Sequence, residues 1–303
     1  MAGNIVEAAP AKINLFLHVG PRRTDGFHPL QSLAVFTDAG DRLTLAPAKE
    51  LILTVEGPFA SQLADEDDNL VLRAAKALGG PGRSAALTLT KNLPVASGIG
   101  GGSSDAAAAL RGLARLWALP DADSLHAIAA GLGSDVPACI DCAPCFMEGR
   151  GEILTPAARM PRLAILLVNP GAKVPTRDVF AALTKGRGTA ATLPANGFAD
   201  TADLLRFLEA TANDLDEPAR RLEPVIAAVL DRLKTLPGAL LARMSGSGAT
   251  CFAIFADDES CARAAATLRA AHPGWWIAPT FVPGRGISPE EPGRDIGPSP
   301  EGL

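Results

Sequence analysis

Apolar and polar residues alternate over the first part of the chain, a pattern typical of half-buried β-strands. Residues 4 to 19 predict one long strand, with Ile13 and Leu15 on one face and Lys12 and Asn14 on the other. Because side chains two positions apart in a strand point the same way, we expect Lys12 and Asn14 to lie side by side. A lysine at the start of a strand is usually only a solvated charge, so this pattern alone assigns it no function.

Further apolar segments divide the rest of the chain into strands and helices. In the first half we expect strands at 30–36, 41–45, 51–55 and 86–91 and helices at 69–78 and 123–131. In the second half we expect strands at 163–168, 239–243, 250–255 and 275–282 and helices at 176–183, 201–210, 216–235 and 258–271. The pattern is irregular and contains two prolines around residues 155–162. We therefore predict a domain boundary there, with domains at 1–158 and 159–282.

A glycine-rich stretch follows the strand expected at 86–91 and leads into an alanine- and leucine-rich run that predicts a helix up to Trp117. Glycines have no side chain to pack, so a cluster of them indicates that the backbone itself must adopt an unusual conformation or approach a ligand closely. The free N–H groups and the dipole of a helix N-terminus favour an anion such as phosphate. A flexible hinge, or a helix start capped by Ser103 or Asp105, is the alternative, and a lone glycine cluster does not decide between them. The stretch reads Val95-Ala96-Ser97-Gly98-Ile99-Gly100-Gly101-Gly102-Ser103-Ser104.

Composition narrows the class of protein. The length of 303 residues suggests about two domains, and 48% hydrophobic residues are ample for their cores. With 28 basic and 33 acidic residues the formal net charge is −5, which disfavours nucleic acid as a partner. The chain has no signal-peptide pattern, and its longest strongly apolar run, 163–168, is far too short to span a membrane. We expect a cytoplasmic monomer or homodimer that binds small molecules.

Five cysteines do not suggest a disulfide framework in a chain of this length. Cys139, Cys142 and Cys145 have a spacing that raises the alternative of a metal site, but no fourth cysteine or histidine lies close by in the sequence. Reduced structural thiols are the simpler interpretation, and we expect no metal site. The last segment, 283–303, is rich in proline and glycine without periodicity, and we expect it to be disordered.

Sequence motifs point to a known family. The glycine stretch lacks the lysine of the P-loop and the third glycine of the dinucleotide fingerprint. Its form, with Pro94 ahead of the glycines and two serines behind them, instead resembles the phosphate loop of the GHMP kinase superfamily. Three other segments resemble motifs of the members of that superfamily that phosphorylate a cytidyl alcohol, and a fourth resembles its third shared motif. They are, in chain order, Pro10-Ala11-Lys12-Ile13-Asn14-Leu15, Asp25-Gly26-Phe27-His28, Gly133-Ser134-Asp135-Val136-Pro137 and Ser245-Gly246-Ser247-Gly248.

The resemblance covers roughly residues 8 to 282 and implies an α+β, two-domain GHMP kinase fold. Its N-terminal domain would be like a domain of a ribosomal protein and its C-terminal domain would be ferredoxin-like. The implied reaction is MgATP-dependent phosphorylation of the 2-hydroxyl of 4-diphosphocytidyl-2-C-methyl-D-erythritol, in non-mevalonate isoprenoid precursor biosynthesis. The cofactors are then ATP and Mg²⁺, the latter arriving with the nucleotide, and we expect the glycine loop at 245–248 to face the first loop.

The resemblance also assigns residues to roles. Lys12 and Asp135 would be catalytic, with Asp135 accepting the proton of the substrate hydroxyl; nothing in spacing alone selects Asp135 over an ordinary turn or cap residue. The nucleotide would contact Asn69, Lys91, Pro94, Val95, Ala96, Ser97, Gly98, Ile99, Gly100, Gly101, Gly102, Ser103 and Ser104, although Asn69 is equally well explained as a helix cap. The alcohol substrate would contact Asn14, Phe27, His28, Asp135, Thr176, Phe180, Ser245, Gly246 and Ser247.

The chain departs from the family pattern at two places. Phe27 stands where many members carry tyrosine, and the loop opens with Val95-Ala96-Ser97 instead of further glycines. Neither change removes a group that the chemistry requires. Two other functions stay open at this point: a non-catalytic nucleotide-binding relative, and a GHMP kinase for another alcohol such as homoserine or a mevalonate-type acid.

Overall fold

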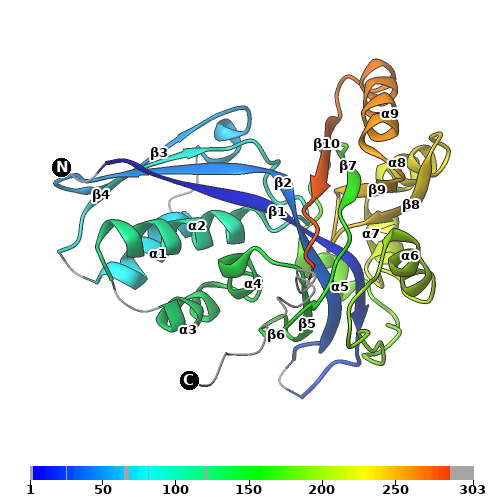
Figure 1. The fold of residues 1–303 in the computed structure, drawn as a ribbon, viewed down its shortest axis with the longest axis horizontal. Coiled ribbons are helices and arrows are strands. Elements are labelled where there is room, and N and C mark those ends of the chain that lie inside the picture. The colour runs from blue at the N-terminus through cyan, green and yellow to red at the C-terminus, as the bar shows by residue number, and fades with distance from the viewer. Residues whose placement is uncertain (1–2, 25, 65–67, 81, 120–121, 287–303) are drawn as a thin grey trace, which may run out of the picture.

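The computed structural model describes all residues except 1–2, 25, 65–67, 81, 120–121 and 287–303. Two long antiparallel strands, β1 (Ile5–Val19) and β2 (Leu30–Ala46), run through the centre of the molecule (Figure 1). Two separate strands were expected at 30–36 and 41–45, and this prediction was wrong. The reason is Gly40, which stays paired with Pro10 inside β2 and lies so close to Ala9 that a Cβ would be 2.6 Å from its carbonyl oxygen.

The first sheet has the order β3-β4-β2-β5-β6, with β1 paired to β2. Helices pack on one of its faces and enclose a core of aliphatic side chains (Figure 1). The strands are β3 (Leu51–Glu56), β4 (Ala85–Thr90), β5 (Cys145–Gly149) and β6 (Ile153–Pro156). The helices are the 3₁₀ helix η1 (Ala60–Leu63), α1 (Leu70–Gly79), α2 (Gly101–Leu116), α3 (Ala122–Leu132) and α4 (Val136–Asp141).

The second sheet is antiparallel and has the order β10-β7-β9-β8. Counted along the chain this is 4-1-3-2, with helices after its first and third strands, which is the ferredoxin-like arrangement expected for this half. The strands are β7 (Leu163–Asn169), β8 (Ala239–Met244), β9 (Cys251–Phe255) and β10 (Trp276–Val282). The helices are α5 (Thr176–Ala181), α6 (Thr201–Glu209), α7 (Asp216–Leu222), α8 (Val225–Lys234) and α9 (Asp258–Ala271).

Three further features differ from the sequence-based expectations. The helix expected at 216–235 is divided at Glu223, because the residue before a proline disfavours helical backbone. The short elements α4, β5 and β6 were not predicted, since four to six residues show too little periodicity. Residues 283–286, expected to begin a disordered tail, include Arg285, which exchanges two backbone hydrogen bonds with Met160. The rest of that tail, 287–303, lies outside the described residues.

Strand β1 belongs to both halves of the molecule. Its N-terminal part lies over α2 in the first sheet, while Ile13 and Leu15 pack with Ile165 and Ile254 of the second sheet. Residues near the middle of β1 therefore lie where the two halves meet. The positions of the domain boundaries stay a prediction. No helix in the described part of the chain has the length and apolar character needed to cross a membrane.

Candidate active site

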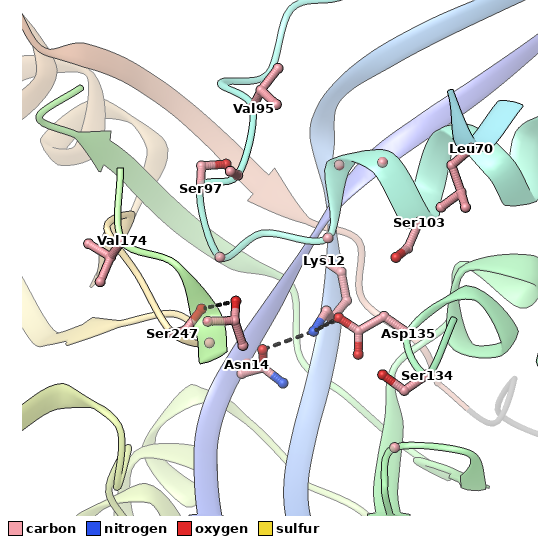
Figure 2. Close-up of a pocket in the computed structure, with 18 of the residues that line it drawn as sticks. Lys12, Asn14, Leu70, Val95, Ser97, Ser103, Ser134, Asp135, Val174 and Ser247 are labelled. Carbon is pink, nitrogen blue, oxygen red and sulfur yellow. Dashed lines mark hydrogen bonds and ion pairs between the residues drawn. The ribbon is translucent and has the colours of Figure 1, made fainter. Parts of the chain in front are cut away.

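A cavity of about 470 Å³ lies where the two halves meet (Figure 2). Its wall comes from the middle of β1, the glycine-rich loop, the start of α2, the turn before α4 and the second glycine loop. Of the residues with expected roles, it is lined by Lys12, Asn14, Asn69, Lys91, Pro94, Val95, Ala96, Ser97, Gly98, Gly100, Gly101, Gly102, Ser103, Asp135, Thr176, Phe180, Gly246 and Ser247.

Lys12 and Asp135 form an ion pair in this cavity, with Nζ 2.9 Å from Oδ2. Lys12 Nζ also donates to Asn14 Oδ1 at 3.0 Å, so the two side chains lie together as the alternation of β1 predicts. Asn14 in turn donates to Ser32 Oγ on β2 at 2.7 Å. Lys12 is only 4% exposed, and a buried ammonium needs such partners. The chain therefore holds one fixed cation and one carboxylate at the same point.

The glycine-rich loop is held against β1 by backbone contacts. Lys12 N donates to Ile99 O at 2.9 Å. Gly98 and Gly100 have φ values of +76° and +63°, which side-chain-bearing residues rarely adopt. A Cβ on Gly98 would also lie 2.6 Å from the carbonyl oxygen of Ser245. Glycine is thus required at 98 both for its conformation and for the close approach of the second loop.

The second glycine loop meets the first directly, which confirms the expectation that the two face each other. Ser245 Oγ donates to Gly98 O at 3.0 Å and accepts from Asn14 N at 3.1 Å. The hydroxyl of Ser247, in the same loop, lies 2.8 Å from the hydroxyl of Thr176 at the start of α5. One serine therefore joins both loops to β1.

Helix α2 begins directly after the loop, with Gly100 as its N-cap residue. The amides of its first turn have no partner within the helix, and its dipole is positive at this end. Ser103 lines the cavity, whereas the Ser104 side chain is fully buried and its Oγ has no hydrogen-bond partner among the described residues. Ile99 is likewise buried, in the core. Ser103 rather than Ser104 is the serine that a ligand in the cavity would reach.

A buried ionic triad lies beneath the loop and was missed by the sequence analysis. Lys91 Nζ is 2.5 Å from Asp41 Oδ2 and 2.7 Å from Asp105 Oδ2. Asp41 Oδ1 also accepts from the amides of Asn92 and Leu93. The triad therefore fixes the chain just before the loop and the first turn of α2 just after it. Burial raises the pKa of Asp105 to about 7, against the opposing effect of Lys91.

Two roles were expected for Asn69, a contact to the nucleotide and a helix cap, and the structure shows the helix cap. Its Oδ1 accepts from Val71 N at 2.9 Å and so caps α1. The residue also lines the cavity, as do the apolar side chains of Leu70 and Val95. The same stretch of cavity is therefore partly apolar, as a wall for a flat base would be.

A second, larger cavity of about 1530 Å³ adjoins the first. It shares Leu30, Ser134, Arg150 and Phe180 with the first cavity, and Phe27 and His28 lie in its wall. The rings of His28 and Phe180 are 5.9 Å apart, and the guanidinium of Arg150 lies 3.9 Å from the centre of the Phe27 ring. The structure thus brings Phe27, His28 and Phe180, three of the residues expected to contact the alcohol substrate, to one cavity. Asp25, the first residue of the motif that contains Phe27 and His28, lies outside the described residues.

The cysteines form no site in the described part of the chain. All five are unpaired, and Cys139 and Cys145 are buried. Burial raises the pKa of Cys145 to about 11, so its thiol stays protonated near neutral pH. No group of three or more His, Cys, Asp or Glu side chains among the described residues is placed to hold a metal ion.

Comparison with known proteins gives the family. The GHMP kinases N terminal domain matches residues 69–149, and the GHMP kinases C terminal domain matches 191–274. A 4-diphosphocytidyl-2-C-methyl-D-erythritol kinase from Cereibacter sphaeroides is 52% identical over 277 residues, which are 91% of this chain and 98% of that protein. The chain belongs to the 4-diphosphocytidyl-2-C-methyl-D-erythritol kinase family. Family membership confirms the expected GHMP kinase fold and the identification of the chain as a small-molecule kinase.

Two more members of this family are similar to the chain over nearly its whole length. A kinase of the same name from Methylobacterium radiotolerans is 52% identical over 289 residues, 92% of this chain and 99% of that protein. A crystal structure of a 4-(cytidine 5'-diphospho)-2C-methyl-D-erythritol kinase matches this chain with a TM-score of 0.72 at 35% identity. The match covers 92% of this chain and 100% of the chain in the crystal structure. The roles of individual residues are not tested by these similarities and stay predictions.

Proposed function

We propose that this chain transfers the γ-phosphoryl group of MgATP to the 2-hydroxyl of 4-diphosphocytidyl-2-C-methyl-D-erythritol. The observation that carries the proposal is the Lys12–Asp135 pair, which lines a nucleotide-sized cavity. Ser134, next to Asp135 in the chain, is shared between that cavity and a larger one lined by His28 and Phe180. The names of the related kinases give independent support for the acceptor.

Asp135 acts as the general base. Its side chain is 35% exposed, so its carboxylate is accessible to a substrate hydroxyl in the cavity. It takes the hydroxyl proton while the oxygen forms a bond to the γ-phosphorus and the bond from that phosphorus to the bridging oxygen of ADP breaks. Such a base contributes roughly 10²–10⁴-fold to rate. The Lys12 ammonium balances the charge that develops on the transferring group and orients the carboxylate.

The glycine-rich loop and the start of α2 hold the nucleotide phosphates through backbone amides, and the Ser103 hydroxyl adds a contact. Phosphoryl transfer depends mostly on this positioning and on charge stabilisation. Mg²⁺, which prefers oxygen ligands and commonly arrives on the phosphates, would neutralise their charge when bound. Ser103 Oγ faces the cavity and fits such a ligand. The adenine would lie by Asn69 and Val95.

The cytosine of the acceptor would lie in the second cavity, against Phe27, His28 and Phe180. A neutral or small alcohol such as homoserine would leave most of that cavity unfilled. We place the reaction in the cytoplasm, in keeping with five unpaired thiols in the chain. Measuring ADP release with a panel of alcohols tests the proposal. The cytidyl compound should be phosphorylated, and efficient use of homoserine or mevalonate with the cytidyl compound inert would refute the assignment.

A further inference from the structure

The second cavity is bordered by an excess of basic residues. They are Arg22, Arg23, Arg150, Arg177, Lys185 and Arg187, whereas Glu152 is the acidic residue among its described lining. The chain as a whole has the opposite balance, with 33 acidic against 28 basic residues. The positive character of this cavity is therefore local, and it would attract anions to a protein that is otherwise negatively charged.

The basic residues come from three separate segments that meet at the cavity. Arg22 lies in the connection between β1 and β2, where its Nε donates to Gly26 O at 2.9 Å. Arg177 lies in α5, and Lys185 follows that helix. The segment after α5 is tied to β1 by Asp214, whose Oδ2 accepts from the amides of Val19 and Arg187 at 2.8 and 2.7 Å. The fold thus brings the segments that carry these cations to one opening.

Neighbouring acids cancel little of this charge. Arg187 has an ion pair with the buried Asp214, at 3.6 Å. Arg177 lies 3.9 Å from Asp178, but both side chains are exposed and such pairs are weak. Arg22 and Lys185 are exposed and form no ion pair with the described acidic residues. Arg22, Arg177 and Lys185, which we call the basic rim, line the second cavity but not the first.

The position of the rim matches the charge of the proposed acceptor. Ser134, which both cavities share, directly precedes Asp135. An acceptor with its base near His28 in the second cavity and its hydroxyl at Asp135 in the first would place the connecting groups in the second cavity, on the side where the two cavities adjoin. In the cytidyl alcohol these groups are a diphosphate esterified at both ends, which carries two negative charges at neutral pH.

We propose that the basic rim captures the diphosphate of the acceptor and so selects polyanionic alcohols over neutral ones. This inference rests on the function proposed above and adds how the acceptor is recognised. Because the rim lies away from Lys12 and Asp135, it acts on association and KM rather than on the transfer step. Charges arranged in this way raise association rates by roughly 10–10³-fold, and the effect falls with ionic strength.

Steady-state kinetics of a triple variant, Arg22→Gln with Arg177→Gln and Lys185→Gln, test the rim. At low ionic strength kcat/KM for the cytidyl substrate should fall at least about tenfold, while kcat and the KM for ATP change less than about twofold. The fall of kcat/KM with added salt should flatten. The matched control combines Arg42→Gln, Lys49→Gln and Lys76→Gln, which remove the same charge at exposed positions outside both cavities. Equal kcat/KM and equal salt dependence in the two triple variants would overturn the inference, as would a loss confined to kcat.

A binding measurement separates this inference from the proposed function. With the first cavity saturated by a non-hydrolysable ATP analogue, calorimetry compares CDP with cytidine. Wild type should bind CDP at least about tenfold more tightly than cytidine, and the rim variant should lose most of that preference. A preference that persists in the rim variant would refute the rim even if the enzyme phosphorylates the cytidyl compound. A preference lost in the variant would support the rim even if that compound proves inert, in which case only the proposed acceptor fails.

Discussion

The ammonium of Lys12 is held 2.9 Å from the carboxylate of Asp135 and is itself almost fully buried. Asp135 is the more exposed member of the pair, so the fixed cation lies behind the carboxylate that a substrate would meet. This relationship fits the two roles proposed above, with Asp135 as the group that exchanges a proton and Lys12 as the source of a compensating charge.

Asp135→Asn and Lys12→Met should each lower kcat by at least about 10²-fold, because one removes the proton acceptor and the other the compensating charge. The affinity for ATP should change little if backbone amides hold the phosphates, as proposed above. Asp141→Asn is a suitable control, because Asp141 lies on α4 outside both cavities and pairs with His126. Wild-type turnover by a folded Asp135→Asn protein would remove Asp135 from the mechanism.

Substitution of loop glycines should weaken nucleotide binding. Gly98→Ala places a Cβ 2.6 Å from Ser245 O at a φ of +76°, so the loop and its neighbour must shift. Gly101→Val would crowd Lys91 Nζ, which lies 3.2 Å from the position of that Cβ. We expect the Kd of a non-hydrolysable ATP analogue, measured by calorimetry, to rise at least about tenfold in both variants. Gly131→Ala in α3, where no atom lies within 4 Å of the added Cβ, should leave the Kd unchanged. Undiminished affinity in both loop variants would mean that the loop serves only to start α2.

The sequence predicted the parts of the site that follow from local periodicity. Alternation along β1 was sufficient to place Lys12 beside Asn14, and the glycine stretch was sufficient to place a loop before α2. The triad of Asp41, Lys91 and Asp105 could not be predicted, because it joins residues 50 and 14 positions apart and each residue alone is unremarkable. Only the fold reveals that they share one buried point.

The triad gives a prediction about stability and pH. Burial raises the pKa of Asp105 from an ordinary value of 3.8 to about 7, so the folded protein binds this proton more tightly than the unfolded chain does. The contribution of Asp105 to stability is therefore present at about pH 4 and is lost as the pH rises towards 7. Asp105→Asn removes this dependence. Denaturant unfolding at several pH values should show the wild-type free energy of unfolding falling relative to the variant, by up to about 1.4 kcal/mol per pH unit. A difference that stays constant between pH 4 and 7 would contradict this account of Asp105.

The residues that line the second cavity come from segments far apart in the chain, so only the motif resemblance could group Phe27, His28 and Phe180 beforehand. We predict that His28→Ala and Phe180→Ala each raise the KM for the cytidyl substrate several-fold, while the KM for ATP stays within about twofold. Phe281→Ala is a control, because Phe281 stacks on Arg162 outside both cavities. Initial-rate measurements with each substrate varied in turn make the comparison. Equal effects on the two KM values would show that these side chains act on the fold rather than on the acceptor.

A competition experiment decides which alcohol accepts the phosphoryl group. The cytidyl compound, methylerythritol 4-phosphate, homoserine and mevalonate are mixed at equal concentration with enzyme and limiting ATP, and the phosphorylated products are counted by mass spectrometry. Product ratios in such a mixture equal ratios of kcat/KM. Because a site built around a base discriminates strongly against ligands that lack it, we predict that the cytidyl product exceeds each other product by at least about 10³-fold. A mixture dominated by phosphorylated homoserine or mevalonate would contradict the account.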